Sequence, residues 1–431
     1  MHCCRKPNIL PFFISFVDGY FLKAESSELV NNIMTHSRLD ILIYAHDGRG
    51  LGHAGRSIGI GMALRRLFPH LKVLFVSGCR QSQELIGASL LDWIKLPSYE
   101  TVVHGGKSTG IPGKSGFSDY QLGFYRAREI EHLVRMYQPR LVLVDHTPQG
   151  KHRELVPALE LGREIGTQWV LGVRGVVGAV SQAGSELAGD LFRKYYRDIL
   201  WYGDREVLGG AHADQLLQQY GMVPMECGYV SRLAEVASRQ GDTFINSSEG
   251  RNLAGTVSVP WLGEKSLGFL EQLAEALAGV PGDYGDWRLF VDTGGSVKVK
   301  KNVWEMFSGL RHCWLEEPGQ RYGDALMHSR TAVIYGGYNS LIDILFSGLP
   351  ALVVEREMRD NEQQLHLHRL QEKIGNRIHV IPESEVSAEQ IVSFLLDNLS
   401  KERVVTAPVN LGGATEGAVI LNQILLEEVG L

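Results

Sequence analysis

Hydrophobic residues gather in short, nearly unbroken runs along the first half of the chain, at residues 39–45, 71–77, 141–145 and 168–173. Runs of this length are typical of strands that are buried on both faces of a parallel sheet. The stretches between them, such as residues 54–67, place apolar side chains at helical spacing. This alternation of strand and helix predicts an α/β fold with a doubly wound sheet.

The alternation pauses at residues 231–241, which read as a bridge between two domains. It then resumes with predicted strands at residues 243–246, 287–292, 331–335, 351–354 and 377–381. We expect an N-terminal extension (1–37), an N-terminal domain (38–235), a C-terminal domain (236–410) and a closing helix within residues 411–431. Two open sheets that face each other leave a ligand cleft at the carboxyl ends of their strands.

Composition narrows the class of protein. The 431 residues carry a net charge of −6 without a block of Lys and Arg, which argues against a nucleic-acid partner. Five scattered cysteines without a CxxC motif argue against a disulfide framework or a structural zinc site and favour the cytoplasm. The apolar run at residues 9–17 resembles the start of a signal peptide, but it is too short to span a bilayer. We favour an extension that precedes the folded protein.

The first candidate site follows the strand at residues 39–45. Gly50 and Gly52 let the backbone approach a ligand before a helix begins, and Arg56 lies one turn further on. The spacing is G-x-G-x-G and differs from the dinucleotide fingerprint G-x-G-x-x-G. His53 stands at the junction of loop and helix, where an imidazole can accept a proton from a substrate hydroxyl. The alternative is a histidine that only satisfies backbone groups at the helix start.

Two further residues end predicted strands of this domain. Asp145 follows an apolar run and can orient His53 or bind an acceptor; alternatively it caps the next helix. Arg174 ends the strand at residues 168–173 and can meet an anionic group of the acceptor or the donor phosphate. The Gly- and Ser-rich residues 104–118 read as a mobile loop over the cleft or as a plain surface loop.

The second candidate site follows the strand at residues 331–335. Paired glycines end at Gly337, and the helix that opens with Tyr338, Asn339 and Ser340 can hold a diphosphate with its free N–H groups. Asp343, about one turn into that helix, can accept hydrogen bonds from ribose hydroxyls. Glu362 and Gln363 follow the next strand and can reach the same crevice to bind sugar hydroxyls. Each residue alone also fits an ordinary turn or helix start, but their order together is specific.

The segment GGYNSLIDILFSGLPALVVEREMRDNEQQ resembles the donor-binding half of nucleotide-sugar glycosyltransferases, closest to family 28. The GLGH of residues 50–53 is similar to the N-terminal glycine loop of that family. The resemblance implies a GT-B fold, an inverting transfer and no required metal or cofactor. By position it assigns the donor ribose to Asp343, the donor sugar to Glu362 and Gln363, the diphosphate to residues 337–340, and a place near the reaction centre to His53.

One segment departs from the family pattern. The family carries a glycine-rich loop after the first strand of the C-terminal domain, where this chain has Asn-Ser-Ser-Glu-Gly-Arg at residues 246–251. Ser247, Ser248 and Arg251 remain as candidate phosphate ligands, although the carboxylate of Glu249 would repel phosphate.

These observations together predict a cytoplasmic hexosyltransferase. Its donor would be a nucleotide-diphosphate sugar, with UDP as the expected nucleotide, and its acceptor a lipid-linked or small molecule. A lipid acceptor would bring the protein to the inner membrane face. The alternatives are a nucleotide-sugar 2-epimerase of the same architecture and a non-catalytic sugar-nucleotide binding protein, which the 246–251 departure supports.

Overall fold

The computed structural model describes residues 38–46, 51–104, 107–177, 184–240, 253–263, 265–319, 321–356, 362–401 and 408–428. Residues 39–431 form one compact unit. The predicted extension at residues 1–37 lies outside the described residues, as do Gly50 and the strand predicted at 243–246.

The first sheet is built from the N-terminal half, as the apolar runs predicted. Its seven described strands are all parallel and are ordered β3-β2-β1-β6-β7-β8-β9. Their bounds are β1 (Ile41–Ala45), β2 (Val73–Ser77), β3 (Asp92–Lys95), β6 (Leu141–Asp145), β7 (Gln168–Arg174), β8 (Tyr196–Tyr202) and β9 (Met225–Glu226). The helices are α2 (Gly52–Leu67), α3 (Ser82–Ile86), α4 (Asp119–Tyr137), α5 (Val156–Glu164), α6 (Glu186–Tyr195), α7 (Arg205–Leu208), α8 (Ala211–Tyr220) and α9 (Arg232–Gln240). Every residue of β1, β2 and β6 is buried, which explains their unbroken apolar sequence.

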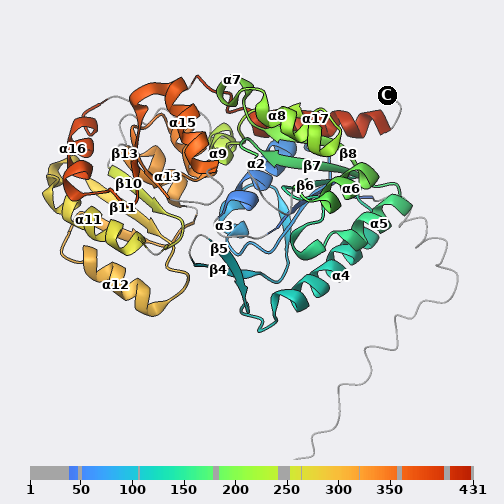
Figure 1. Ribbon diagram of the computed structural model, residues 1–431, viewed down its shortest axis with the longest axis horizontal. Helices are drawn as coiled ribbons and strands as arrows, with labels where there is room; N and C mark the ends of the chain where they lie inside the picture. Colours follow the sequence, from blue (N-terminus) through green and yellow to red (C-terminus); the bar gives the residue numbers. More distant parts are fainter. Residues whose placement is uncertain are drawn as a thin grey trace, which may run out of the picture. The chain divides into compact units, whose positions relative to one another are not determined.

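The second sheet has six described strands, again all parallel, in the order β12-β11-β10-β13-β14-β15. Their bounds are β10 (Leu253–Val259), β11 (Asp286–Val291), β12 (Cys313–Glu316), β13 (Ser329–Tyr335), β14 (Ala351–Glu355) and β15 (Ile378–Pro382). The helices are α11 (Ser266–Gly279), α12 (Val297–Phe307), α13 (Arg321–Met327), α14 (Tyr338–Ser347), α15 (Glu362–Ile374), α16 (Ala388–Asn398) and α17 (Gly413–Glu428). The predicted fold class, two doubly wound α/β domains, is therefore confirmed (Figure 1).

Each sheet reverses its strand order at one point, between β1 and β6 in the first sheet and between β10 and β13 in the second. Loops that leave the carboxyl ends of two such strands diverge to opposite faces, and the crevice between them is where open α/β sheets bind ligands. His53 follows β1 and Asp145 ends β6, whereas Gly336 follows β13. The candidate residues thus flank the two reversal points.

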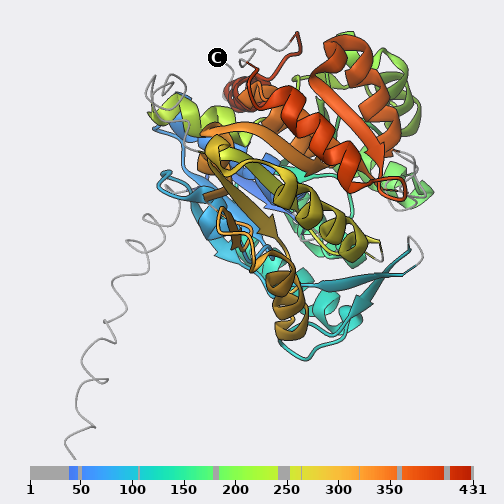
Figure 2. The ribbon, with the colours of Figure 1, turned by 90° about the vertical axis from the view of Figure 1, so that its left-hand side faces the viewer.

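Three local predictions need correction. The bridge at residues 231–241 is largely helical, because α9 buries Leu233 and Ala237. Part of the predicted loop 104–118 is a two-stranded antiparallel hairpin of β4 (Glu100–His104) and β5 (Lys107–Ile111), drawn in teal in Figure 2. The central strand β10 begins at Leu253, after the segment 246–251, so the loop that follows this strand among the described residues starts at Pro260.

The closing helix belongs to the core of the other half. α17 packs against α2, and Figure 1 shows it, in red, beside the helices of the N-terminal half. Ala418, Leu421 and Leu425 share a hydrophobic cluster with β1 and α2. Arg66 of α2 donates a hydrogen bond to the Thr415 hydroxyl at 2.9 Å.

Candidate active site

A cavity of about 310 Å³ is lined by residues from both halves of the chain. The N-terminal half contributes the start of α2, the end of β7 and one residue of α9. The C-terminal half contributes the carboxyl ends of β10, β11 and β13 and the starts of α14 and α15. The lining includes these predicted site residues: Gly52, His53, Arg56, Arg174, Gly337, Tyr338, Asn339, Ser340, Asp343 and Gln363.

Five predicted site residues lack a described position or a described side chain. Gly50, Ser247, Ser248 and Arg251 lie outside the described residues. Glu362 begins α15, but its side chain is not among those described. Their roles stay predictions.

His53 and Asp145 form a hydrogen-bonded pair at the N-terminal wall of the cavity. Nδ1 of His53 lies 2.5 Å from Oδ2 of Asp145, and the carboxylate is almost fully buried behind the imidazole. Burial lowers the pKa of His53 well below its usual value, and the nearby charges of Arg56, Arg174 and Lys151 lower it further. The imidazole is therefore neutral at neutral pH.

The carboxylate of Asp145 also fixes the tautomer of His53. A nitrogen 2.5 Å from a carboxylate oxygen must carry the hydrogen, so Nδ1 donates to Asp145 and Nε2 keeps a lone pair. Nη2 of Arg56 lies 3.2 Å from both Nδ1 of His53 and Oδ2 of Asp145. Because Nδ1 is already a donor, we assign the Arg56 hydrogen to the carboxylate. Nε2 is then the atom of His53 that can accept a proton.

The segment that follows Asp145 has an unusual backbone. His146, His152 and Arg153 have φ values of 86°, 54° and 64°, in the left-handed region that side chains other than glycine disfavour. The rings of His46, His53 and His146 lie close together, with the first two centroids 4.1 Å apart. Among the described side chains, no group of His, Cys, Asp or Glu is arranged to hold a metal ion.

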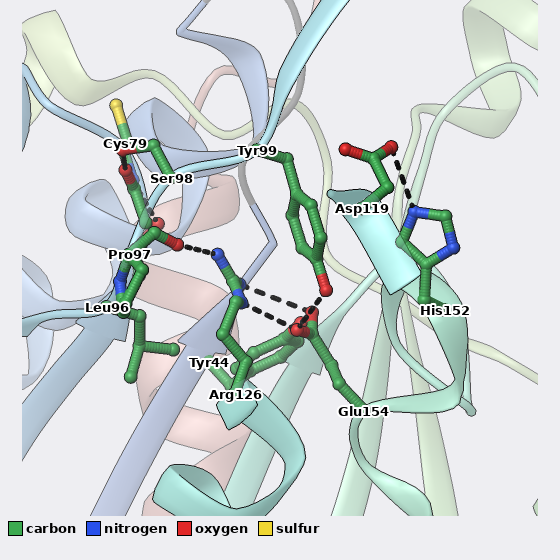
Figure 3. A network of polar contacts seen from close by, with 12 residues as sticks. Tyr44, Cys79, Leu96, Pro97, Ser98, Tyr99, Asp119, Arg126, His152 and Glu154 are labelled. Atoms are coloured by element: carbon green, nitrogen blue, oxygen red, sulfur yellow. Dashed lines mark hydrogen bonds and ion pairs between the residues drawn. The ribbon is translucent and has the colours of Figure 1, made fainter. Parts of the chain in front are cut away.

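A buried polar network stabilises the far end of this segment (Figure 3). The carboxylate of Glu154 accepts hydrogen bonds from Nε of Arg126 at 2.6 Å, from the hydroxyl of Tyr99 at 3.0 Å and from the hydroxyl of Tyr44. Nη1 of Arg126 donates to the carbonyl of Pro97 at 2.7 Å. Since Tyr44 lies on β1 next to β6, the network holds the strained segment against the strands that carry the His53–Asp145 pair. No local pattern predicts this network, because its members lie far apart along the chain.

The opposite wall contains the start of α14. Gly337 is its N-cap and provides no side-chain hydrogen bond to the first helical N–H groups. A Cβ atom at Gly336 would lie 2.9 Å from Leu367, which explains one of the paired glycines by packing. A helix start without a capping side chain, open to a cavity, can donate its free N–H groups to an anion such as phosphate.

The side chains at this helix start contact the N-terminal half. The hydroxyl of Tyr338 donates to the carbonyl of Tyr202 at 2.9 Å and accepts from the N–H of Val230 at 3.2 Å. Nδ2 of Asn339 donates to the carbonyl of Gly52 at 3.2 Å. These positions, which the resemblance assigns to donor binding, also line the cavity, and Oδ1 of Asn339 is buried without a hydrogen-bond partner among the described residues.

Asp343 lies further into the same wall. Burial raises its pKa to about 7, and the positive charge of Arg232 opposes that rise. Arg232 belongs to α9 and lines the same cavity, a position that the sequence pattern did not indicate because its segment read as a linker.

Deeper in the C-terminal half, Oε1 of Gln363 is buried and has no hydrogen-bond partner among the described residues. Burial lowers the pKa of the neighbouring His366 to about 3, so this imidazole is also neutral.

No helix among the described residues is both long and apolar enough to cross a membrane. No protein-family model matches the chain, and no curated protein matches its sequence.

Solved structures share its architecture at low sequence identity. One is the UDP-GlcNAc 2-epimerase of Methanocaldococcus jannaschii, with 10% identity over 90% of this chain and 98% of the other, at a TM-score of 0.56. Another is MnaA of S. aureus with UDP, with 12% identity over 90% and 97% of the two chains, at a TM-score of 0.58. A third is Arabidopsis thaliana UGT89C1 complexed with UDP-L-rhamnose, with 10% identity over 90% and 98%, at a TM-score of 0.58. These similarities, together with the two sheets, show that the chain has the GT-B fold.

Proposed function

We propose that this chain is an inverting glycosyltransferase that moves a hexosyl group from a UDP-sugar to an acceptor hydroxyl. The observation that carries the proposal is the arrangement across the cavity. A neutral His53 held by Asp145 lies on one wall, and an uncapped helix start with Asp343 and Gln363 lies on the other. The UDP and UDP-sugar bound to two structurally similar proteins support the choice of donor.

The donor would lie along the C-terminal wall. Its diphosphate would accept hydrogen bonds from the N–H groups of residues 338–340, whose helix dipole favours negative charge. The carboxylate of Asp343 would accept from ribose hydroxyls. The nucleotide base would lie just after β12, where Pro318 and Tyr322 line the cavity. Ser247, Ser248 and Arg251 remain further candidates for the phosphate.

The acceptor would enter beside His53. Its O–H bond breaks as the proton passes to Nε2, and the acceptor oxygen forms a bond to the anomeric carbon of the donor. The bond between that carbon and the phosphate oxygen breaks, and its electron pair leaves with UDP. Asp145 stabilises the imidazolium that forms, and the helix start stabilises the charge of the leaving diphosphate. Arg174, at the end of β7, would contact an anionic group of either substrate.

Turnover by two variants tests this role. The wild-type chain is incubated with UDP-glucose or UDP-N-acetylglucosamine and a panel of hydroxyl acceptors, and released UDP is measured. His53→Ala should lower kcat at least 100-fold while UDP still binds, since removing a general base costs about 10²–10⁴ in rate. His132→Ala is the matched control, because His132 is exposed on α4. Equal rates for wild type and His53→Ala would refute the assignment.

The alternative function is a nucleotide-sugar 2-epimerase, which the likeness to such an enzyme from Methanocaldococcus jannaschii supports. Incubating UDP-N-acetylglucosamine alone and observing the sugar by NMR separates the two activities. Appearance of the 2-epimer without an acceptor favours the epimerase. Binding of UDP without turnover of either kind favours a sugar-nucleotide binding protein.

A further inference from the structure

The loop that follows β10 presents an aromatic side chain to the cavity. Trp261 lies just beyond the carboxyl end of β10, at the reversal point of the second sheet, and it lines the cavity together with Gly336 and Gly337. A bulky aromatic residue at the ligand-binding edge of a sheet offers a flat apolar surface to a ligand.

A buried guanidinium holds the indole in place. The Cζ atom of Arg356 lies 3.6 Å from the centroid of the Trp261 ring and 3.7 Å from that of Tyr335. Nη2 of Arg356 also donates to the carbonyl of Trp261 at 2.6 Å. Only 5% of Arg356 is exposed. Stacking on two rings together with a hydrogen bond to the backbone fixes both the side chain and the main chain of residue 261.

Hydrogen bonds to Glu383 and Ser266 support this stack from below. The hydroxyl of Tyr335 donates to Glu383 at 2.7 Å, and the hydroxyl of Ser266 donates to the same oxygen at 3.0 Å. Nε of Arg356 lies 3.7 Å from that carboxylate. The N–H of Gly263 donates to Ser266 at 2.9 Å, which anchors the other end of the loop. The indole therefore belongs to a rigid surface.

The contacts of Trp261 with Arg356 and Tyr335 also determine on which side of the cavity the indole lies. Tyr335 ends β13 and Arg356 follows β14, so the loop after β10 is drawn toward that side of the sheet. Gln363, the second residue of α15, lines the same cavity with a buried Oε1 that lacks a partner among the described residues. An apolar surface and an unsatisfied amide oxygen together match a pyranose ring, which has C–H groups on its faces and hydroxyl groups at its edge.

We infer that Trp261 is the platform on which the hexosyl ring of the donor packs, beside Gln363, to which the family resemblance assigns the donor sugar. This inference rests on the proposed function, since it names the residues that distinguish a UDP-sugar from UDP. Arg356 and Glu383 are positioning residues, because they act on the sugar only through Trp261.

Calorimetric binding of three probes tests the platform: UDP, UDP-glucose and UDP-N-acetylglucosamine. Trp261→Ala should weaken the UDP-sugar that wild type prefers about tenfold while changing the affinity for UDP less than twofold. Trp261→Phe should restore most of the loss, because a phenyl ring keeps a flat apolar face. Trp304→Ala, at a well-exposed position on α12, is the matched control and should change neither affinity. A thermal melt of each variant reports whether it is folded.

The outcomes distinguish a failure of the Trp261 platform from a failure of the proposed function. Equal weakening of UDP and UDP-sugar by Trp261→Ala, or no weakening of either, overturns the platform and leaves the proposed function intact. If Trp261→Ala does not fold, the same comparison made with Trp261→Phe and Trp261→Leu decides, and loss of sugar selectivity in Trp261→Leu alone supports the platform. A wild-type chain that binds none of the three probes overturns the proposed function and the platform with it.

Discussion

Each half of the molecule contains a buried arginine and glutamate near the ligand edge of its sheet, but the two pairs are built differently. In the N-terminal half, Arg126 and Glu154 meet directly at 2.6 Å, and both are fully buried. In the C-terminal half, Arg356 and Glu383 are 3.7 Å apart, and the guanidinium places its faces on Trp261 and Tyr335.

The difference lies in what each arginine contacts. The partners of Arg126 include Glu154, the Pro97 carbonyl and the Tyr99 ring, and none of these lines the cavity. Arg356 touches Trp261, which does line it. We therefore expect changes at the first pair to affect mainly folding, and changes at the second pair to affect ligand selectivity as well.

The largest expected effect is on stability. Arg126→Met leaves the carboxylate of Glu154 buried without its cation, and breaking a buried pair in this way costs about 3–5 kcal/mol of the free energy of unfolding. Denaturant titration measures the loss. The double variant Arg126→Met/Glu154→Gln should recover part of it, because no unpaired charge remains. A loss below about 1 kcal/mol for the single variant would contradict the structural role.

A third titratable group sharpens the comparison, because Asp343 lines the cavity and the positive charge of Arg232 acts on its carboxyl group from α9. Its pKa is raised to about 7, so the folded chain keeps a proton that the unfolded chain loses near pH 4. The contribution of Asp343 to the free energy of unfolding is fully present below about pH 4 and is lost as the pH rises through about 7. Relative to Asp343→Asn, the wild type should lose roughly 2.5 kcal/mol between pH 5 and pH 8. Parallel stability curves for the two chains would argue against the burial of this carboxyl.

Removal of Arg356 should lower the free energy of unfolding less than removal of Arg126. After Arg356→Met, Glu383 still accepts hydrogen bonds from Tyr335 and Ser266, so we expect a loss of about 2 kcal/mol. The distinguishing result is in binding: the ratio of UDP-sugar affinity to UDP affinity should fall, as it does for Trp261→Ala. Arg356→Lys keeps the charge without the planar faces and should show the same change in ratio. If both Arg356 variants leave the ratio of UDP-sugar affinity to UDP affinity unchanged, then Arg356, like Arg126, affects only stability.

The smallest effect concerns the contact between the halves. A Cβ atom at Gly55 would lie 2.7 Å from Nδ2 of Asn339, which must then leave the carbonyl of Gly52. Gly55→Ala should cost about 1 kcal/mol, the value of one hydrogen bond. The same substitution in an Asn339→Ala background should be neutral or favourable. Gly268→Ala, in a helix with open space around the position, is the control that should gain stability.

The fold could be predicted from the sequence wherever burial alone determines the order of apolar and polar residues. β1, β2 and β6 are fully buried and therefore apolar at every position. β10 was missed because packing interrupts its apolar run: a Cβ at Gly255 would lie 2.3 Å from the Trp287 ring. The glycine that weakened the strand signal is required by the neighbouring strand.

The candidate site was partly accessible for a related reason. His53, Asp343 and Gln363 follow strands of the two sheets, so their order along the chain was enough to bring them to one cavity. Trp261 and Arg232 were missed because one follows the unrecognised strand and the other lies in a segment that read as a linker. Their roles depend on contacts with distant residues, such as Arg356 and Asp343, that no local pattern encodes.

The position of α17 has a practical consequence for dividing the molecule. A fragment that stops at residue 240 would expose the surface of α2 that Ala418 and Leu421 normally cover, so we expect it to aggregate. A hybrid protein should instead exchange the C-terminal sheet as an insert, joined after α9 and before α17, and keep residues 413–428 with their original partner. The polypeptide thus passes through its second sheet and returns to complete the first.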